Sequence, residues 1–316
     1  MSHSLQAKDR DFGLGIQAPR VDVVQSDELT QQRLTLKVLR LDLMHPNIHG
    51  NKWFKLKHNI AYILQQGISR VLSFGGAYSN HIRALAALGE QLGIETIGVI
   101  RGERVEPLNP VLEFAERCGM GLTFVDRAAY RRKAELAMLD SLRQRFGEFY
   151  LLPEGGSNAL GVQGCEELAQ ILAAPPLNPD FVMLPCGTGA TIAGLIRGLT
   201  KLENRQISVL GVSVLKAPGY LHGEVAGWLR GIGGTPQWQV LEDFHCGGFG
   251  RTNPELSSFL SAFETYADIP LEPVYSGKLF HALFQLVEAG RFPSGSEILA
   301  LHTGGLPGEA RPSSDM

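Results

Sequence analysis

The residues most suited to chemistry are the lysines of the run Gly50-Asn51-Lys52-Trp53-Phe54-Lys55-Leu56. Lys52 supplies a primary amine, which forms a Schiff base with an aldehyde once its pKa is depressed. A place at a helix start favours that depression, because the positive end of the helix dipole disfavours a protonated amine. Lys55 lies one turn further along and could reach a phosphate on the same side. Taken alone, the cluster with Lys57 is more typical of a solvated helix face.

A second run, residues 75–81 with the sequence Gly-Gly-Ala-Tyr-Ser-Asn-His, follows an apolar strand candidate. Its two glycines permit a positive φ and a close approach of the backbone. Ser79 or Asn80 can cap the helix that begins here, and the free N–H groups of a helix start favour a carboxylate. Plain capping is the simpler interpretation of this run by itself.

Residues 187–191, Gly-Thr-Gly-Ala-Thr, form a turn between the apolar strand candidate Phe181–Leu184 and a helical segment. Such a turn is a phosphate cradle. It lacks both the lysine of a Walker loop and the glycine spacing of a dinucleotide fingerprint, so a nucleotide-binding oxidoreductase has little support. Together with the amine at Lys52 and the helix start at Ser79, the turn predicts a site for pyridoxal 5'-phosphate (PLP) and an amino-acid carboxylate.

The elements that must position these residues alternate along the chain from about residue 35. Short apolar strand candidates separated by helical segments are typical of parallel sheets covered on both faces, so the sequence predicts an α/β protein. The strand candidates are Val71–Phe74, Thr96–Ile100, Leu122–Val125, Phe149–Leu151, Phe181–Leu184, Val209–Val212 and Ile298–His302. The helical candidates include Leu56–Gln66, His81–Leu92, Val111–Cys118, Ala129–Phe146 and Gly161–Ala173.

The composition excludes several classes of protein. A length of 316 residues allows one large domain or two ordinary ones, and 44% hydrophobic residues is ordinary for a globular chain. A net charge of −3 gives no reason to expect nucleic acid or a membrane surface as partner, and no apolar run approaches the ~20 residues that span a bilayer. The polar N-terminus and four cysteines without a Cys-x-x-Cys pair predict a cytoplasmic protein with no disulfide frame and no metal site.

Several motifs occur in an order that resembles one family. They are Gly50-Asn51-Lys52-x-x-Lys55-Leu56, Gly76-x-x-Ser79-Asn80-His81-x-Arg83, Glu154-Gly155-Gly156-Ser157-Asn158, the 187–191 turn, Pro273-Val274-Tyr275-Ser276-Gly277-Lys278 and His302-Thr303-Gly304-Gly305. The chain is similar, from about residue 35 to 308, to the 1-aminocyclopropane-1-carboxylate (ACC) deaminase and D-cysteine desulfhydrase family, which has the tryptophan-synthase-β type of PLP fold. The motifs are specific for fold and cofactor and much less so for substrate.

The resemblance implies an architecture. We expect two open twisted α/β domains with the cofactor in the cleft between them. The smaller domain would comprise residues 43–160, and the larger, PLP-binding domain residues 1–42 together with 161–316. A homodimer that binds a small amino-acid substrate is expected.

The resemblance also implies roles for the first two motifs. Lys52 would form the Schiff base with PLP and, once released, move protons at the substrate. Asn80 would hydrogen-bond the 3-hydroxyl of PLP. Ser79, Asn80 and His81 would hold the substrate carboxylate, with Ser79 among the catalytic residues.

Further roles fall to the downstream motifs. Tyr275 would be catalytic and face the substrate, and Ser276 would lie at the pyridine nitrogen. Lys55 and the 187–191 turn would hold the phosphate. The full set of cofactor-binding residues implied by the resemblance is Lys52, Lys55, Asn80, Gly187, Thr188, Gly189, Ala190, Thr191, Ser276 and Thr303.

Departures from the family pattern bear on the substrate. ACC deaminases carry Glu at the position of Ser276, and a hydroxyl there should leave the pyridine nitrogen largely neutral, which suits elimination of a good leaving group. Phe249 stands where the family usually has a second active-site tyrosine, so opening of a cyclopropane is not expected. His81 in place of the usual Gln favours the same view. Trp53 and Phe54 also differ from the family and are expected to reshape the site.

The sequence therefore predicts a PLP-dependent lyase that catalyses α,β-elimination on a small β-substituted amino acid. A D-cysteine-like substrate would give pyruvate, ammonia and the leaving group. ACC deamination and amino-acid racemisation are alternatives within the family. A PLP-binding regulatory module without turnover, motivated by Phe249, is the alternative from another class.

Overall fold

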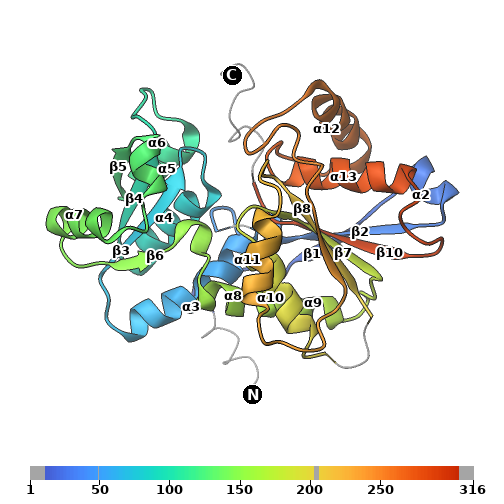
Figure 1. The fold of residues 1–316 in the computed structure, drawn as a ribbon, viewed down its shortest axis with the longest axis horizontal. Helices are drawn as coiled ribbons and strands as arrows, with labels where there is room; N and C mark the ends of the chain where they lie inside the picture. Colours follow the sequence, from blue (N-terminus) through green and yellow to red (C-terminus); the bar gives the residue numbers. More distant parts are fainter. Residues whose placement is uncertain (1–10, 49, 203–205, 306–316) are drawn as a thin grey trace. The chain divides into compact units, whose positions relative to one another are not determined.

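The structure, a computed structural model, describes residues 11–48, 50–202 and 206–305. Their contacts divide into two compact units, each built around one sheet (Figure 1). The first unit contains residues 11–18 and Met44–Gly161, and the second contains Pro19–Leu43 and the described residues from Val162 onward. Residues 11–18 thus group with the first unit, whereas the sequence analysis placed residues 1–42 in the larger domain. The predicted α/β fold class is confirmed.

The first unit holds a four-stranded parallel sheet in the order β5-β4-β3-β6. Its strands are β3 (Arg70–Gly76), β4 (Glu95–Arg101), β5 (Gly121–Val125) and β6 (Tyr150–Leu152). Its helices are α3 (Asn51–Gln65), α4 (Asn80–Leu92), α5 (Pro110–Arg117), α6 (Arg127–Arg131), α7 (Leu136–Phe146) and the 3-10 turn η2 (Glu154–Gly156). The central strand β3 is almost wholly buried, which explains why its sequence is mostly apolar, with Ser73 as a buried polar exception. Two predicted site motifs lie in this unit, at the N-termini of α3 and α4.

The second unit holds a six-stranded sheet in the order β1-β2-β10-β7-β8-β9. Its strands are β1 (Arg20–Val24), β2 (Thr35–Arg40), β7 (Phe181–Cys186), β8 (Ser208–Ser213), β9 (Trp238–Leu241) and β10 (Glu297–His302). The edge strand β1 pairs antiparallel with β2, and the remaining pairs are parallel. Because β7 and β10 are adjacent and parallel, the 187–191 turn and residues 303–305 follow the same edge of the sheet.

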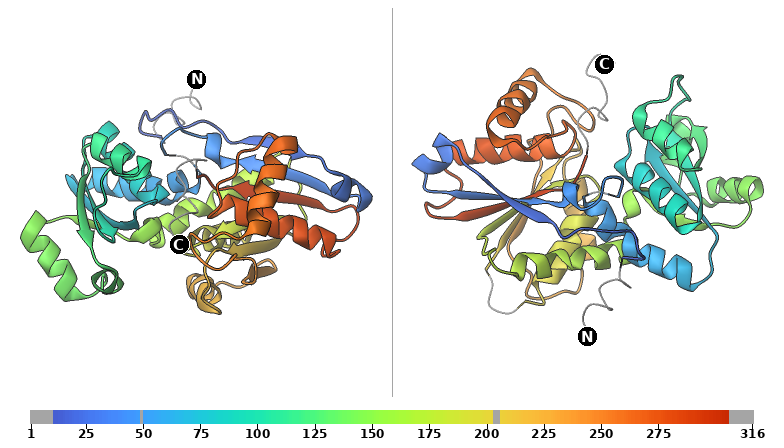
Figure 2. Two further views of the ribbon diagram at one scale, coloured as in Figure 1. Left: turned by 90° about the horizontal axis from the view of Figure 1, so that it is seen from above. Right: turned by 180° about the vertical axis from the view of Figure 1, so that it is seen from behind.

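Helices cover both faces of this sheet. They are α2 (Asp27–Gln31), α8 (Ala159–Glu166), α9 (Leu168–Ala173), α10 (Ala190–Leu199), α11 (Tyr220–Trp228), α12 (Pro254–Ala267) and α13 (Ser276–Glu288), with the 3-10 turn η1 (Leu41–Leu43). Figures 1 and 2 show α12 and α13 on one face and α9 and α10 on the other. The core beneath α13 is rich in aromatic residues such as Phe263 and Phe280, whose ring centroids lie 4.9 Å apart.

Several predicted helices differ from the structure. Helix α3 begins at Asn51, not at Leu56, because Gly50 adopts φ 68° and lets the chain enter the helix directly. The single helix predicted over Ala129–Phe146 is two helices, since Asp126 caps a first short one and a turn precedes the second. The segment predicted over Gly161–Ala173 is likewise interrupted, between α8 and α9. The strands β1, β2 and β9 were not among the predicted strands.

Candidate active site

Lys52 is the second residue of α3 and is partly exposed. Its amine donates a hydrogen bond to the side-chain oxygen of Asn51. No side chain caps the start of α3 in the described structure, so the first backbone N–H groups and the amine of Lys52 share one electropositive helix end. Such an end disfavours a protonated amine and suits a nucleophilic lysine.

Lys55 lies one turn further along α3, and only 3% of its surface is exposed. Its Nζ donates to the hydroxyl of Ser157 at 2.9 Å. Gly156 packs against Lys55, and a Cβ there would lie in ordinary contact, 3.4 Å from the Cβ of Lys55. Glycine is favoured at this position by its φ of 66°, which a residue with a side chain rarely adopts.

A polar network ties α3 to that same segment. The amide of Asn59 donates to the Lys55 carbonyl and to Asn158 Oδ1, at 2.9 and 3.1 Å. Asn158 donates back to Asn59 Oδ1 at 2.7 Å, and the hydroxyl of Tyr150 donates to the same oxygen at 3.0 Å. Ser157 and Asn158 belong to the motif Glu154-Gly155-Gly156-Ser157-Asn158, in which the sequence indicates no role for either residue. Their contacts assign them the positioning of Lys55.

Ser79 is the N-cap of α4, and its hydroxyl oxygen accepts the N–H of Ile82 at 3.3 Å. A capping hydroxyl still has its own proton to donate, so Ser79 can cap the helix and bind an anion at once. A Cβ at Gly75 would lie 2.9 Å from the Ser79 oxygen, which explains the glycine at this position. Asn80 is the first residue of α4 and, like Ser79, is partly exposed.

His81 is 2% exposed, and its Nε2 lies 2.8 Å from the hydroxyl of Ser73 on β3. That hydroxyl has one proton, and it lies 2.8 Å from the carbonyl of Leu152, to which it donates. The Ser73 oxygen must therefore accept from His81, which places the imidazole proton on Nε2. Nδ1 is then a buried acceptor with no hydrogen-bond partner among the described residues.

Charge reinforces this protonation state. Burial, with the charges of Lys55 and Lys52, lowers the pKa of His81 well below its usual range. A neutral imidazole lies close to two lysines, so the α3 and α4 helix starts share one electropositive region of the first unit. This is the environment that a substrate carboxylate requires.

The second unit contains the predicted phosphate turn. Strand β7 ends at Cys186, and Gly189 adopts φ 77° as the N-cap of α10. No side chain caps α10 within the described residues, whereas Ser79 caps α4. A Cβ at Gly187 would lie 3.1 Å from the ring of Tyr275, so this glycine lets the turn and the tyrosine approach. Thr188 is partly exposed, and Ala190 and Thr191 are buried in the first turn of α10.

Tyr275 and Ser276 are held by a glutamate that the sequence analysis did not single out. The carboxylate of Glu272, which is 3% exposed, accepts the backbone N–H groups of Val274, Tyr275 and Ser276 at 2.6 to 2.7 Å. A carboxylate at this position is stabilised by the dipole of α13. Burial raises the pKa of Glu272 although these hydrogen bonds oppose the shift. The only sequence signal was a Glu just before Pro273-Val274-Tyr275.

Ser276 is fully buried as the first residue of α13. Its hydroxyl oxygen accepts the Glu272 N–H at 3.0 Å and lies 3.2 Å from Glu272 Oε1. The hydroxyl is thus fixed in place by Glu272, and a carboxylate lies directly behind it. Thr303, 6% exposed, follows the end of β10.

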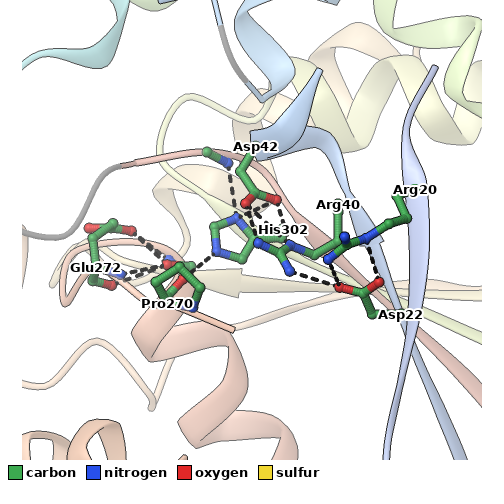
Figure 3. A network of polar contacts seen from close by, with 9 residues as sticks. Arg20, Asp22, Arg40, Asp42, Pro270, Glu272 and His302 are labelled. Atoms are coloured by element: carbon green, nitrogen blue, oxygen red, sulfur yellow. Dashed lines mark hydrogen bonds and ion pairs between the residues drawn. The ribbon is translucent and has the colours of Figure 1, made fainter. Parts of the chain in front are cut away.

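A buried ionic network fixes that end of β10 (Figure 3). Arg40 donates to Asp42 through Nε and Nη2, at 2.9 and 2.7 Å, and to Asp22 at 2.8 Å. Asp42 in turn lies 3.3 Å from Nδ1 of His302, whose Nε2 is 2.9 Å from the carbonyl of Pro270. Figure 3 shows His302 between Asp42 and the loop that carries Pro270 and Glu272. The network therefore joins the strand ends to the loop that presents Tyr275.

Phe249 contacts the same tyrosine. Its ring lies edge-on to that of Tyr275, with centroids 5.8 Å apart at an interplanar angle of 74°, and it is 46% exposed. Within the described residues, no group of three or more His, Cys, Asp or Glu side chains could hold a metal ion. No described helix is long and apolar enough to cross a bilayer.

Comparison with known proteins identifies the family. Residues 18–304 match the family described as pyridoxal-phosphate dependent enzyme. The chain belongs to this family. Its members depend on PLP, and the protein is a PLP-dependent enzyme. The predicted family, enzyme class and cofactor are thereby confirmed.

Individual relatives agree. The chain is 31% identical over 284 residues to a putative ACC deaminase of Thermotoga maritima, covering 86% of this chain and 88% of that protein. It is 29% identical over 274 residues to D-cysteine desulfhydrase of Klebsiella pneumoniae, covering 82% and 83%. A solved structure of an ACC deaminase homologue has the same fold, with a TM-score of 0.81 and 24% identity over 93% of this chain and 91% of that one.

The residues present suit this cofactor. The first unit offers an amine at an uncapped helix start, and the second offers a glycine turn at the uncapped start of α10. PLP needs an amine for its aldehyde and backbone N–H groups for its phosphate. When bound, it acts as an electron sink for carbanions at the α-carbon of an amino acid.

Proposed function

We propose that this PLP-dependent enzyme catalyses α,β-elimination on a small β-substituted amino acid of the D-cysteine type. The products would be pyruvate, ammonia and the leaving group. The observation that carries the proposal is the contact between Tyr275 and Phe249. This pair contains one phenol and one phenyl ring, whereas opening of a cyclopropane is expected to need two phenols. Ser276, a hydroxyl and not a carboxylate at the proposed pyridine-nitrogen position, supports the same choice.

The roles of individual residues are part of the proposal. Lys52 would hold PLP through its amine, which lies at the electropositive start of α3, and would then move the α-proton of the substrate. Lys55 and the 187–191 turn would hold the phosphate. Ser276 would lie at the pyridine nitrogen, with Thr303 and Asn80 as further cofactor contacts.

The carboxylate of the substrate binds at the start of α4. Ser79 has a proton to donate there, and Asn80 supplies its amide. His81, a neutral imidazole close to the charges of Lys55 and Lys52, is the third residue proposed to hold this carboxylate. Tyr275 faces the β-substituent and is the acid that assists its departure. We also propose that the enzyme is a cytoplasmic homodimer and that the two units are its two domains.

The test is to load the protein with PLP and supply D-cysteine, L-cysteine and ACC separately. Pyruvate from D-cysteine and no four-carbon 2-oxo acid from ACC is the expected result. A four-carbon 2-oxo acid formed from ACC would contradict the elimination and favour deamination. Interconversion of D- and L-cysteine, followed on a chiral column and without formation of pyruvate, would favour racemisation. Absence of any spectral change with all three would favour the regulatory module.

A further inference from the structure

Lys278 is a buried lysine for which the proposed reaction has no use. It lies on α13 two residues after Ser276, and its side chain is fully buried. Burial lowers its pKa to about 8. A lysine is almost never placed in a core without a polar partner, so its contact indicates what it does.

Its partner is a backbone carbonyl of the loop 246–250. Nζ of Lys278 donates to the oxygen of Gly248 at 2.7 Å. An amine keeps N–H groups in both of its protonation states, so this bond persists on either side of the pKa. The bond fastens the loop to the helix that begins with Ser276.

The loop needs such a restraint. Cys246, Gly247, Gly248 and Gly250 all have positive φ values, of 49°, 92°, 121° and 68°. A run of this kind is costly for any residue with a side chain and leaves the glycines free to adopt other conformations. Short-range bonds turn the loop, from Gly248 N–H to the His245 carbonyl and from Arg251 N–H to the Gly248 carbonyl, and the bond from Lys278 fastens it to α13.

The shape matters because it presents Phe249. The ring stands edge-on to Tyr275, and Tyr275 in turn lies against Gly187 of the phosphate turn. A partly exposed phenyl ring offers no hydrogen bond to a hydroxyl or a charge. It does attract sulfur and other polarisable groups.

We propose that Lys278 is a positioning residue, which holds residues 246–250 so that Phe249 lies on the edge of Tyr275. We further propose that this aromatic pair selects substrates with an uncharged, polarisable β-substituent, namely a thiol, a thioether or a halide. The selectivity rests on the proposed elimination, whereas the loop restraint does not.

The restraint is tested without catalysis, by trypsin cleavage after the exposed Arg251 in the PLP-free protein. Lys278→Met keeps the length of the side chain and removes one donor to the Gly248 carbonyl, which still accepts the Arg251 N–H at 3.1 Å. We expect cleavage about 2- to 12-fold faster, the effect of one lost hydrogen bond on loop opening. Lys201→Met, at a lysine whose side chain is 67% exposed, is the control and should be cleaved after Arg251 at the wild-type rate.

Selectivity is tested by comparing the preference for D-cysteine over D-serine between variants. Wild-type and Phe249→Leu proteins are compared for kcat/KM on D-cysteine relative to D-serine, which cancels the intrinsic difference between the two leaving groups. Loss of the ring should lower this preference by about 2- to 12-fold. Lys278→Met should lower it as well, while PLP absorbance shows that the cofactor is retained.

An unchanged cleavage rate in folded Lys278→Met protein would overturn the restraint. If that variant does not fold, Gly248→Ala is used, because a side chain at the φ of 121° strains the loop at the residue that Lys278 contacts. Unchanged cleavage of folded Gly248→Ala protein would likewise overturn the restraint. An unchanged thiol preference in Phe249→Leu would overturn the selectivity. A protein that binds no PLP would overturn the proposed function instead, while the trypsin result would still decide the role of Lys278.

Discussion

Asp42→Asn removes a buried charge and almost no volume from the network that holds the end of β10. The Asp42 side chain is 6% exposed and receives two hydrogen bonds from the guanidinium of Arg40, which is itself 3% exposed. An amide in its place leaves Arg40 with one carboxylate, that of Asp22. The contact with His302 loses its charge as well.

The magnitude follows from burial. Removing one partner of a buried ion pair costs about 3–5 kcal/mol, since the other charge stays out of water uncompensated. Asp22 still pairs with Arg40, so we expect the lower end, about 3 kcal/mol of unfolding free energy. The matched control is Asp22→Asn on the same guanidinium. The Asp22 side chain is 22% exposed, and its loss should cost about 1 kcal/mol or less.

Urea unfolding of the wild type and both variants, followed by far-UV circular dichroism, measures the two losses. The expected order is a large loss for Asp42→Asn and a small one for Asp22→Asn. Equal losses, or a loss below about 1 kcal/mol at Asp42, would refute the reasoning, because burial would then not decide the cost.

Three further predictions concern single side chains. The pKa of Lys278 is about 8 in the folded protein and 10.5 ordinarily, so the unfolded chain binds more protons between pH 8 and pH 10.5. The free energy of unfolding should therefore rise by about 3 kcal/mol as the pH is raised across this window. Urea titrations at several pH values should show the rise in the wild type and not in Lys278→Met. Phe249→Tyr restores a second phenol beside Tyr275 and should permit formation of a four-carbon 2-oxo acid from ACC; an active variant on D-cysteine that gives none would contradict this role for the ring. Gly194→Ala would drive a methyl group into the Val162 carbonyl where α10 meets α8, and thermal unfolding should show a loss of about 1–3 kcal/mol, whereas Gly223→Ala, which meets open space in α11, should show none.

The sequence predicted the elements whose signals are local. Strands such as β3 and β7 are largely apolar, and the turns after them contain the glycines that a close approach requires, so both the strands and the 187–191 turn were found. Helix α3 was placed five residues late, because its start depends on the positive φ of Gly50 and on no side-chain cap. The edge strand β1 has little burial and therefore no apolar pattern.

The supporting residues of the site could not be predicted in the same way. Glu272 and Lys278 are charged side chains that the sequence gives no reason to bury. Their roles depend on backbone groups brought to them by the fold, namely the start of α13 and the carbonyl of Gly248. Ser157 meets Lys55 across 102 positions of sequence, a pairing that no local spacing reveals.

The central claim is that Lys52 carries PLP, and the most direct measurement is to locate the cofactor chemically. The PLP-loaded enzyme is reduced with borohydride, digested and analysed by mass spectrometry. We expect one pyridoxyl group, on Lys52, and no visible absorbance band in Lys52→Ala protein. A label on Lys278, a fully buried lysine with a lowered pKa, or a band that survives in Lys52→Ala, would contradict this assignment.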